Sequence, residues 1–412
     1  MSSWAPHWQI VELGEFATFR NGINFGDANR GRGIKLVGVS NFRDNFLVPY
    51  DDLDEINPLG VIREDDLLKE NDIVFVRSNG NRQLIGRTLF VKDLPGKVTH
   101  SGFTIRLRFH SQELYPEFYA QLFRSDMIRD ELSQSGSGTN ISNLNQQTLG
   151  ELAVPLPPLP EQRKIAAILS TWDEAITLME RLIEALRQRK QALMQLLLTG
   201  EVRFKVFEGK ARPEMQLESY IDLLTGFPFS SENFKDVPGV KLLRGINITT
   251  GSLRWEEGHT KYWDSIDAKL EKYSLRENDI VIGMDGSLVG HNFAWLSRND
   301  LPSLLVQRVA RLRSKSGLNQ NYLFQYIGSP FFTRYVDSVR TVTAIPHISP
   351  ADIKDFTINL PSEAEQTRIA EVLHSCDDEL NICISMGIQL QIQKRGLMQQ
   401  LLTGAIRVQL EE

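Results

Sequence analysis

Hydrophobic residues recur at alternating steps of four and three positions in two long segments, one at residues 161–198 and a counterpart near the C-terminus. This is the spacing of a heptad repeat, so it predicts two long helices, each with one apolar seam. Each seam skips one slot, at Lys190 and at Lys394. The predicted seam residues are Ile165, Leu169, Trp172, Ile176, Leu186 and Leu193 in the first segment and Ile369, Leu373, Leu380, Leu390 and Leu397 in the second. Two seams of equal length in one chain most simply pack against each other.

Both predicted helices carry start and stop signals. Prolines and glutamates stand near each start, and Thr199-Gly200 and Thr403-Gly404 fit a helix that ends at a glycine. A helix of about 38 residues is roughly 57 Å long, so the pair would form a rigid spacer. An isolated coiled coil is more often only a dimerisation or core element, and the duplication described next weakens that alternative here.

The helical segments belong to a longer internal repeat. The run LMQLLLTGEVR at 193–203 returns as LMQQLLTGAIR at 397–407, 204 residues later. Upstream, KENDIVF at 69–75 matches RENDIVI at 276–282 at nearly the same offset. A period of this length indicates two domain-sized copies and not a solenoid. We predict a first module at 1–154, a helical region at 155–204, a second module at 212–357 and a second helical region at 358–408.

Each module mixes short strand-like runs with helical stretches. DIVFV at 72–76 and DIVIGM at 279–284 are typical of strands, and PEFYAQLFRSDMIRDEL at 116–132 is typical of helix. The predicted fold class is therefore α+β. It comprises two tandem α/β modules separated by two long antiparallel coiled-coil helices, with an internal pseudo-twofold symmetry.

Two loops that follow equivalent predicted strands, 77–87 and 284–292, suggest contacts to nucleic acid. The first combines three arginines with asparagines and a glutamine and has no acidic residue. Arginine and asparagine or glutamine make bidentate contacts to guanine and adenine, and loop glycines let a backbone approach phosphates. A second basic, glycine-rich segment at 20–35 is a candidate phosphate site. The candidate DNA contacts are Arg20, Asn21, Arg30, Arg32, Arg77, Asn79, Asn81, Arg82, Arg87, Thr139 and Asn140 in the first module, and Arg244, Asn247, Ser287, His291, Arg308, Arg340, Thr341, Thr343 and His347 in the second.

Each of these residues taken alone is more often part of a solvated turn than a contact. The arginines of IRLR at 105–108 and ARLR at 310–313 are also compatible with simple alternation out of a strand. The hypothesis of a binding surface rests on the recurrence of such residues at equivalent places in both copies.

Composition and charge limit the class of protein. The 412 residues carry 46 basic and 52 acidic side chains, a net charge of −6, which argues against coating nucleic acid through bulk positive charge. Two cysteines are too few for a disulfide framework, and the N-terminus lacks the basic start and apolar core of a signal peptide. No apolar run approaches the roughly 20 residues that span a bilayer. We therefore expect a cytoplasmic protein without a membrane role.

A search for catalytic motifs finds none. The sequence has no Walker-type phosphate loop, no H-E-x-x-H, no G-x-S-x-G and no dinucleotide fingerprint. Cys376 and Cys383 fall on the second seam, where small apolar side chains are expected, and they lack the partners of a metal site. Asp285 has no second carboxylate or histidine beside it in the sequence. An enzyme is the weaker hypothesis, and no metal ligands are predicted.

The duplicated block resembles that of a known family. PLPPLPEQ at 155–162 leads into a long helix that ends in LLTG at 197–200, and LPSEAEQ at 360–366 leads into a second helix with the same ending at 401–404. With the flanking modules, each carrying ENDIV and a glycine-rich loop, the whole chain resembles the specificity subunit of type I restriction-modification systems. The second copy departs by lacking most of the prolines, which leaves open how the second helix is entered.

The resemblance implies a non-catalytic, DNA-binding subunit. Each module would be a target recognition domain that reads one half of a split target in double-stranded DNA, and the helix pair would set the spacing and bind two methyltransferase subunits. ATP-dependent restriction subunits would join that complex. This chain would bind no cofactor, because S-adenosylmethionine, ATP and Mg²⁺ would be held by the partner subunits. A stand-alone protein-binding scaffold and a nucleic-acid enzyme remain the alternatives.

Overall fold

The chain folds into two compact units, and both long helices contribute to each unit. The computed structural model describes residues 4–25, 30–43, 45–57, 62–135, 144–341 and 345–410, without the side chains at 30, 82 and 133–135. Unit 1 comprises residues 1–180 and 385–412, and unit 2 comprises residues 181–384. Each unit thus contains one module, the first half of the helix that follows this module and the second half of the other long helix.

Unit 1 contains three small sheets and three short helices among its described residues. Its helices are α1 (Pro116–Arg124), α2 (Asp126–Ser135) and α3 (Gln146–Gly150). The sheets have the strand orders β2-β8-β5-β6, β4-β3-β7 and β1-β9. The strands are β1 (Gln9–Glu12), β2 (Ala17–Asn21), β3 (Arg30–Val37), β4 (Asp54–Ile56), β5 (Ile73–Val76), β6 (Thr88–Phe90), β7 (Val98–His100), β8 (Thr104–Phe109) and β9 (Ala153–Leu156).

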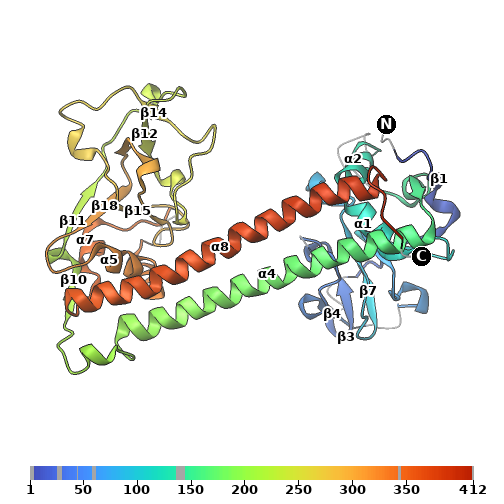
Figure 1. Ribbon diagram of the computed structural model, residues 1–412, viewed down its shortest axis with the longest axis horizontal. Helices are drawn as coiled ribbons and strands as arrows, with labels where there is room; N and C mark the ends of the chain where they lie inside the picture. Colours follow the sequence, from blue (N-terminus) through green and yellow to red (C-terminus); the bar gives the residue numbers. More distant parts are fainter. Residues whose placement is uncertain are drawn as a thin grey trace. The chain divides into compact units, whose positions relative to one another are not determined.

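Unit 2 repeats this plan. Its helices are α5 (Gln320–Ile327), α6 (Pro330–Val339) and α7 (Pro350–Asp355), and α5 and α7 each lie next to one strand of the five-stranded sheet (Figure 1). The sheets have the orders β11-β18-β15-β16-β13, β14-β12-β17 and β10-β19. The strands are β10 (Glu214–Gln216), β11 (Ile221–Thr225), β12 (Val240–Leu243), β13 (Thr250–Gly251), β14 (Tyr262–Trp263), β15 (Ile280–Gly283), β16 (Phe293–Trp295), β17 (Ser303–Leu305), β18 (Val309–Ser314) and β19 (Thr357–Asn359).

Every strand pairing of unit 1 has a counterpart in unit 2, which adds the short strand β13 beside β16. In both, the central strand (β5 or β15) is completely buried and lies between two antiparallel neighbours, and one pair in the three-stranded sheet is parallel (β3 with β7, β12 with β17). Burial on both faces explains why these central strands read as continuous apolar runs and not as alternating ones. The fold class predicted from the sequence, two tandem mixed modules with long helices, is therefore confirmed.

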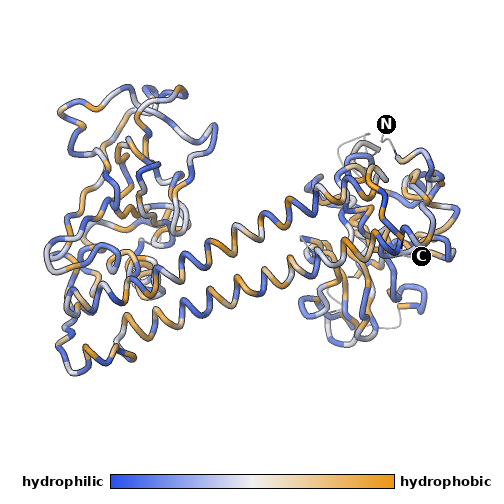
Figure 2. The backbone as a smooth tube through the Cα atoms, viewed as in Figure 1, coloured by the Kyte–Doolittle hydropathy of each residue, from blue (hydrophilic) through white to orange (hydrophobic). Residues whose placement is uncertain are grey.

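The two predicted long helices are present as α4 (Leu159–Thr199) and α8 (Glu363–Leu402). Hydrophobic and hydrophilic residues alternate along both (Figure 2). In unit 1, Ile165 and Leu169 of α4 share a buried cluster with Leu401 and Leu402 of α8. In unit 2, the start of α8 packs with the end of α4 in the same way. Within each unit the two helix segments therefore run antiparallel.

The repeated Glu-Gln pair at each helix start joins the helix to its module. Gln162 accepts a hydrogen bond from the backbone N–H of Tyr115 (2.7 Å) and donates to the carbonyls of Glu113 (2.9 Å) and Pro157 (2.8 Å). Its side chain is fully buried. This glutamine therefore fixes the loop before α1 against the first turn of α4.

Gln366 makes the equivalent contacts in unit 2. It accepts from the N–H of Asn319 (2.8 Å) and donates to the carbonyls of Gly317 (2.9 Å) and Pro361 (2.8 Å). The missing prolines of the second copy therefore do not change the way in which the helix is entered.

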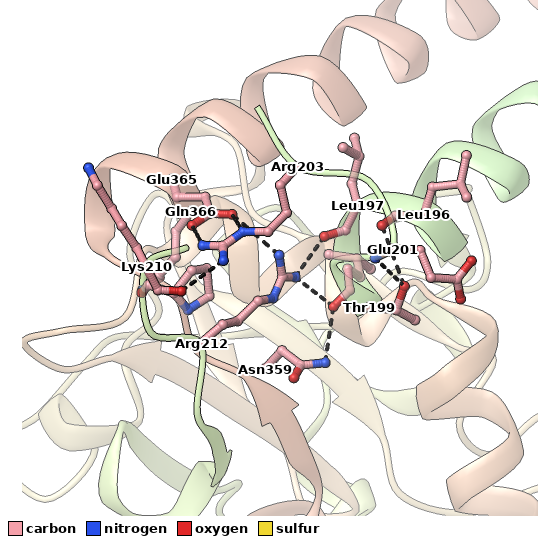
Figure 3. Close-up of polar contacts among 12 residues, drawn as sticks. Leu196, Leu197, Thr199, Glu201, Arg203, Lys210, Arg212, Asn359, Glu365 and Gln366 are labelled. Carbon is pink, nitrogen blue, oxygen red and sulfur yellow. Dashed lines mark hydrogen bonds and ion pairs between the residues drawn. The ribbon is translucent and has the colours of Figure 1, made fainter. Parts of the chain in front are cut away.

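Glu365, the partner of Gln366 in the motif, lies in a buried ion-pair cluster (Figure 3). Arg203 donates to both of its carboxylate oxygens, at 2.9 and 2.6 Å, and Arg212 lies 3.4 Å from one of them. Arg212 also donates to the carbonyls of Leu197 (2.6 Å) and Leu198 (2.7 Å) near the end of α4. This cluster ties the end of one long helix to the beginning of the other within unit 2.

The equivalent junction of unit 1 is built differently. Glu161 is also buried, but it accepts a hydrogen bond from the indole N–H of Trp8 (3.2 Å), and its Oε1 has no hydrogen-bond partner among the described atoms. The backbone N–H of Ala5 donates to the carbonyl of Thr403 (2.8 Å), at the end of α8. Unit 1 therefore replaces a double arginine clamp with one neutral donor.

The lysine that interrupts each seam forms a polar triad. Lys394 Nζ lies 2.5 Å from Asp173 Oδ1, and Gln121 Nε2 of α1 donates to Asp173 Oδ2 (2.6 Å). Lys394 is 7% exposed, and burial lowers the pKa of its ammonium group, an effect that the carboxylate of Asp173 partly offsets. The triad connects both long helices to α1.

Unit 2 contains the same triad. Lys190 Nζ lies 2.5 Å from Asp377 Oδ1, and Gln325 Nε2 of α5 donates to Asp377 Oδ2 (3.1 Å). The skipped seam position is thus a repeated, specific contact, and its role was not visible from the heptad pattern.

Candidate nucleic-acid interface

In each unit, three segments meet at one end of the sheet that contains the central strand, β5 in unit 1 and β15 in unit 2. We call this sheet the central sheet and this surface the sheet-end face. In unit 2 it consists of residues 284–292 after β15, residues 306–308 before β18 and residues 345–348 before α7. The N–H of Met284 donates to the carbonyl of Arg308 (3.0 Å), and the N–H of Ile348 donates to the carbonyl of Met284 (3.0 Å).

In unit 1 the sheet-end face consists of residues 77–87 after β5, residues 101–103 before β8 and residue 144 before α3. The N–H of Arg77 donates to the carbonyl of Phe103 (2.8 Å), and the N–H of Leu144 donates to the carbonyl of Arg77 (2.9 Å). The backbone bonds of the two units thus match, while the side chains differ. Both loops that the sequence indicated lie on these faces.

Arg308 is the most prominent side chain of the face in unit 2. Its φ is 67°, in the left-handed region that arginine rarely adopts, and its side chain is 65% exposed. Its Nη1 donates to Asp285 Oδ2 (2.9 Å), and Asp285 pairs with His347 across an isolated antiparallel bridge. Such backbone conformations cost of order 1–3 kcal/mol and concentrate at functional sites. The fold therefore holds an exposed guanidinium at this edge at a measurable cost.

Other predicted contacts of unit 2 lie on the same sheet-end face or next to it in the sequence. Thr341 and His347 exchange hydrogen bonds, since the N–H of Thr341 donates to the carbonyl of His347 and the N–H of His347 donates to Thr341 Oγ1 (both 3.0 Å). Ser287 is exposed, and His291 is half-buried in the same loop. Arg340 lies at the end of α6 and forms an ion pair with Asp337 on that helix (3.2 Å).

A glycine sets the shape of this loop. Gly290 has a φ of 81°, and a Cβ atom at this position would come within 2.6 Å of Val336 on α6. Only glycine satisfies both the left-handed backbone and the close approach. The loop is therefore packed against α6.

The loop of unit 1 is organised by its own asparagines. Asn79 Oδ1 accepts from the N–H of Asn81 (2.8 Å), and Asn81 Oδ1 accepts from the N–H of Gln83 (3.0 Å). Two successive Asx turns of this kind hold a loop without a regular strand. Arg87 donates to the carbonyl of Arg43 (2.6 Å), which uses part of its guanidinium inside the module.

Several predicted contact residues lie outside the structural description. Thr139, Asn140 and Thr343 are not among the described residues, and the side chains of Arg30 and Arg82 are likewise left out. Their assignment as DNA contacts stays a prediction.

The glycine-rich segment of unit 1 divides into internal and exposed residues. Arg20 donates twice to Asp66 Oδ1, from Nε (3.0 Å) and from Nη2 (2.6 Å). Burial raises the pKa of Asp66, but the backbone N–H of Arg63 and the Arg20 guanidinium outweigh it, so the pKa lies below its usual value. Arg20 is therefore engaged in a structural ion pair, whereas Asn21 and Arg32 are exposed.

Two predicted contacts of unit 2 are engaged within the chain, and the burial of Asn247 corrects the sequence interpretation at that position. Asn247 is fully buried, accepts from the N–H of Arg244 (3.1 Å) and donates to the carbonyl of Arg254 (3.2 Å). Arg244 donates to the carbonyl of His259 and stacks over Phe234, and burial lowers the pKa of its guanidinium. Asn247 therefore holds a loop together, whereas Arg244 is half-buried and its assignment as a DNA contact stays a prediction.

The strand arginines are also internal. Arg108 donates to both carboxylate oxygens of the fully buried Asp72, at 2.7 and 2.6 Å. Arg313 makes the same bidentate contact with Asp279, and that hydrogen bond raises the pKa of its guanidinium. The duplicated IRLR and ARLR motifs thus supply the same bidentate ion pair with a buried aspartate in both units.

Phe103 was missed by the sequence analysis. It is 60% exposed and occupies the position in unit 1 that Arg308 occupies in unit 2. A search for polar side chains could not find it. The only sequence signal is its place two residues before the repeated IRLR motif.

The described residues offer no sign of metal chemistry or of a membrane span. Among them, no three histidine, cysteine, aspartate or glutamate side chains are grouped so as to hold a metal ion. None of the described helices has both the length and the apolar character needed to cross a bilayer.

Comparison with known proteins identifies the family. A family model described as "Type I restriction modification DNA specificity domain" matches residues 6–188 and again residues 214–394. The chain belongs to this type I DNA specificity family. The type I restriction enzyme MjaVIII specificity subunit of Methanocaldococcus jannaschii is 27% identical, over 97% of this chain and 93% of that protein.

Solved structures of the type I specificity family show the same fold. The S subunit of a type I restriction-modification system from M. genitalium aligns with a TM-score of 0.59 at 13% identity, over 96% of both chains. A chain from a structure of the assembly and conformational transition of a type I R-M system aligns with a TM-score of 0.57 at 19% identity, over 98% of this chain and 99% of that one. The resemblance inferred from the duplicated helix block is confirmed.

Each type I specificity domain carries one sheet-end face. The face of unit 1 lies within the first matched range and that of unit 2 within the second. The relatives are specificity subunits of type I restriction enzymes by name, and one of the solved structures concerns the complex assembly of a type I R-M system.

Proposed function

We propose that this chain reads DNA for a type I restriction-modification complex and that each sheet-end face reads one half of a bipartite target. The observation that supports this most directly is the recurrence of one backbone arrangement, once in each specificity domain, with different side chains on it. Two equivalent sheet-end faces with unlike side chains suit two unlike half-sites, because side chains read base identity and contacts to the DNA backbone fix the orientation of the protein on the duplex.

The chemistry of methylation and cleavage would belong to partner subunits. Two methyltransferase subunits would hold S-adenosylmethionine, restriction subunits would hold ATP and Mg²⁺, and this chain would contribute no active site and bind no cofactor. Asp285, which the sequence analysis considered as a catalytic acid, accepts a hydrogen bond from Arg308. The complex would act on chromosomal DNA in the cytoplasm.

The long helices would set the distance between half-sites and dock the methyltransferase subunits. Ile388 and Ile392, one turn apart on α8, are 51% and 58% exposed. Glu180, Arg181, Glu184 and Arg187 on α4 are exposed as well. Exposed apolar and charged side chains along a helix are suited to a protein partner.

Methylome sequencing of the host with and without this gene tests the proposal. One split, adenine-methylated motif should disappear on deletion and return on complementation. If no such motif disappears, the chain does not direct a methyltransferase and the proposal is wrong.

A variant of Arg308 tests whether the sheet-end face of unit 2 reads one half of the methylated DNA motif. Arg308→Ala should relax the sequence requirement in one half of the motif and leave the other half unchanged. Arg298→Ala is the matched control, because this exposed arginine follows β16 at the end away from the loop, where Trp295 pairs with Ile280. Equal loss at both halves would assign Arg308 to general affinity.

A further inference from the structure

Phe103 and Arg308 occupy equivalent backbone positions. In each unit this residue stands directly before a strand of the central sheet, and its carbonyl accepts from the N–H of the residue that follows the central strand. Both side chains are exposed, Phe103 by 60% and Arg308 by 65%. One position of the sheet-end face thus carries an apolar ring in unit 1 and a guanidinium in unit 2.

The exposure of Phe103 comes from a rigid backbone. Its carbonyl accepts from the N–H groups of both Arg77 (2.8 Å) and Ser78 (3.3 Å). The preceding Gly102 donates to the carbonyl of Ile23 (2.7 Å), and a Cβ there would lie 2.0 Å from Asn24 Oδ1. The turn is therefore fixed on both sides, and the ring is presented to solvent by the fold.

The surroundings of Phe103 favour a nucleic-acid partner. The guanidinium of Arg77 lies beside the turn, with Nη1 3.5 Å from the carbonyl of Gly102. The loop that follows Arg77 contains only polar, glycine and aliphatic residues up to Arg87, with no acid among them. An apolar ring within a basic, amide-rich surface matches a major groove that displays methyl groups between polar base edges.

We propose that Phe103 contacts the 5-methyl group of a thymine in the half-site that unit 1 reads. This inference rests on the proposed function. Phenylalanine makes apolar contact with the thymine methyl group, whereas arginine binds the O6 and N7 atoms of guanine. The same position on the two sheet-end faces would therefore select an A·T pair in one half-site, through Phe103, and a G·C pair in the other, through Arg308.

Deoxyuridine substitution tests the contact directly, since uracil differs from thymine only by this methyl group. The full-length chain in complex with its methyltransferase subunits is titrated with duplexes that carry the methylated motif, in which each thymine in turn is replaced by deoxyuridine. Loss of one buried methyl contact should weaken binding about fourfold at one position of one half-site. In Phe103→Ala, the thymine and deoxyuridine duplexes should bind equally at that position.

Two further variants separate contact from folding. Phe103→Leu keeps an apolar side chain and should retain a reduced preference for thymine. Ile10→Ala is the control for loss of an exposed apolar side chain, because Ile10 is 44% exposed on β1 and pairs there with Pro155. It should keep the full thymine preference.

Three results would overturn the inference. If the wild-type complex binds its motif specifically but Phe103→Ala retains the same thymine preference, Phe103 does not read the methyl group although the proposed function stands. If 2-aminopurine placed beside the sensitive position becomes fluorescent on binding and this signal disappears in Phe103→Ala, the ring acts as a wedge between bases. If the wild-type complex shows no sequence preference, the proposed function fails together with the inference.

Discussion

Removing the carboxylate of Asp173 isolates a buried lysine. In unit 1, Asp173 is the ionic partner of Lys394, and it also accepts a hydrogen bond from Gln121. The side chain of Lys394 is 9% exposed, so water cannot replace the lost carboxylate without a rearrangement of the helices. In Asp173→Ala the pKa of Lys394, already lowered by burial, should fall further.

The magnitude follows from the contact distance and the burial. Two unit charges 2.5 Å apart attract each other by about 7 kcal/mol at an effective dielectric constant of about 20. Most of this energy offsets the desolvation of the two ions, but breaking a buried pair leaves the remaining charge uncompensated and typically costs about 3–5 kcal/mol. We expect a loss of about 3 kcal/mol in the free energy of unfolding of unit 1.

Unit 2 supplies a matched control within the same chain. Asp377→Ala removes the equivalent carboxylate, but its partner Lys190 is 19% exposed and can be rehydrated more easily. The loss there should be about 1–2 kcal/mol. Hydrogen exchange followed by mass spectrometry resolves the two units, because α1 carries Gln121 and α5 carries Gln325. A loss of 3 kcal/mol corresponds to roughly 150-fold faster exchange in α1 when exchange reports the opening equilibrium.

The result that would refute this reasoning is equally specific. Asp173→Ala combined with Lys394→Met removes both charges and should recover most of the lost stability, because an apolar side chain of similar length is well tolerated in place of a buried pair. If the double variant is no more stable than Asp173→Ala, the cost does not come from the stranded lysine. Equal losses for Asp173→Ala and Asp377→Ala would show that burial does not set the magnitude.

Three further predictions concern other contacts. Glu365→Gln leaves two arginines without their carboxylate and should destabilise unit 2 by about 3 kcal/mol, whereas Glu161→Gln should cost less than about 1 kcal/mol, as measured by urea denaturation. Burial, aided by the charge of Arg106, lowers the pKa of His100 to about 3, so below pH 6.5 the unfolded chain binds a proton that the folded chain excludes. The free energy of unfolding of unit 1 should therefore fall by about 1.4 kcal/mol between pH 7.5 and 5.5, and His100→Gln should remove this pH dependence. Gly290→Ala should lower the melting temperature and weaken recognition of one half-site, because the left-handed backbone at Gly290 and the neighbouring helix α6 exclude a Cβ. If DNA recognition is unchanged in this variant, the shape of this loop does not contribute to base recognition.

The repeat determined much of the architecture in advance. The long helices, their buried seam ends such as Ile165 and Ile369, and the correspondence between the modules all follow from patterns that are local in the sequence or recur at a fixed offset. Helical and strand periodicities depend on neighbours a few residues away, so a single sequence displays them.

The candidate site was predicted less completely, because a side chain has the same identity whether it is exposed or engaged. Arg20 and Arg308 look alike in the sequence and each pairs with an aspartate, but the side chain of Arg20 is 35% exposed, whereas that of Arg308 is 65% exposed at a left-handed backbone position. Asn247 reads as a polar loop residue and is in fact fully buried. The ring of Phe103 gave no polar signal at all.

What the sequence by itself determined is the duplicated plan: two modules, two long helices and the motifs that join them. Only the tertiary structure decided which charges are used internally and which are presented, since ion pairs such as Lys394 with Asp173 join residues more than 200 positions apart. Local patterns depend on backbone geometry over a few residues, whereas the pairing and exposure of a side chain depend on everything packed around it. The position shared by Phe103 and Arg308 became visible only when the backbone hydrogen bonds of the two units could be matched.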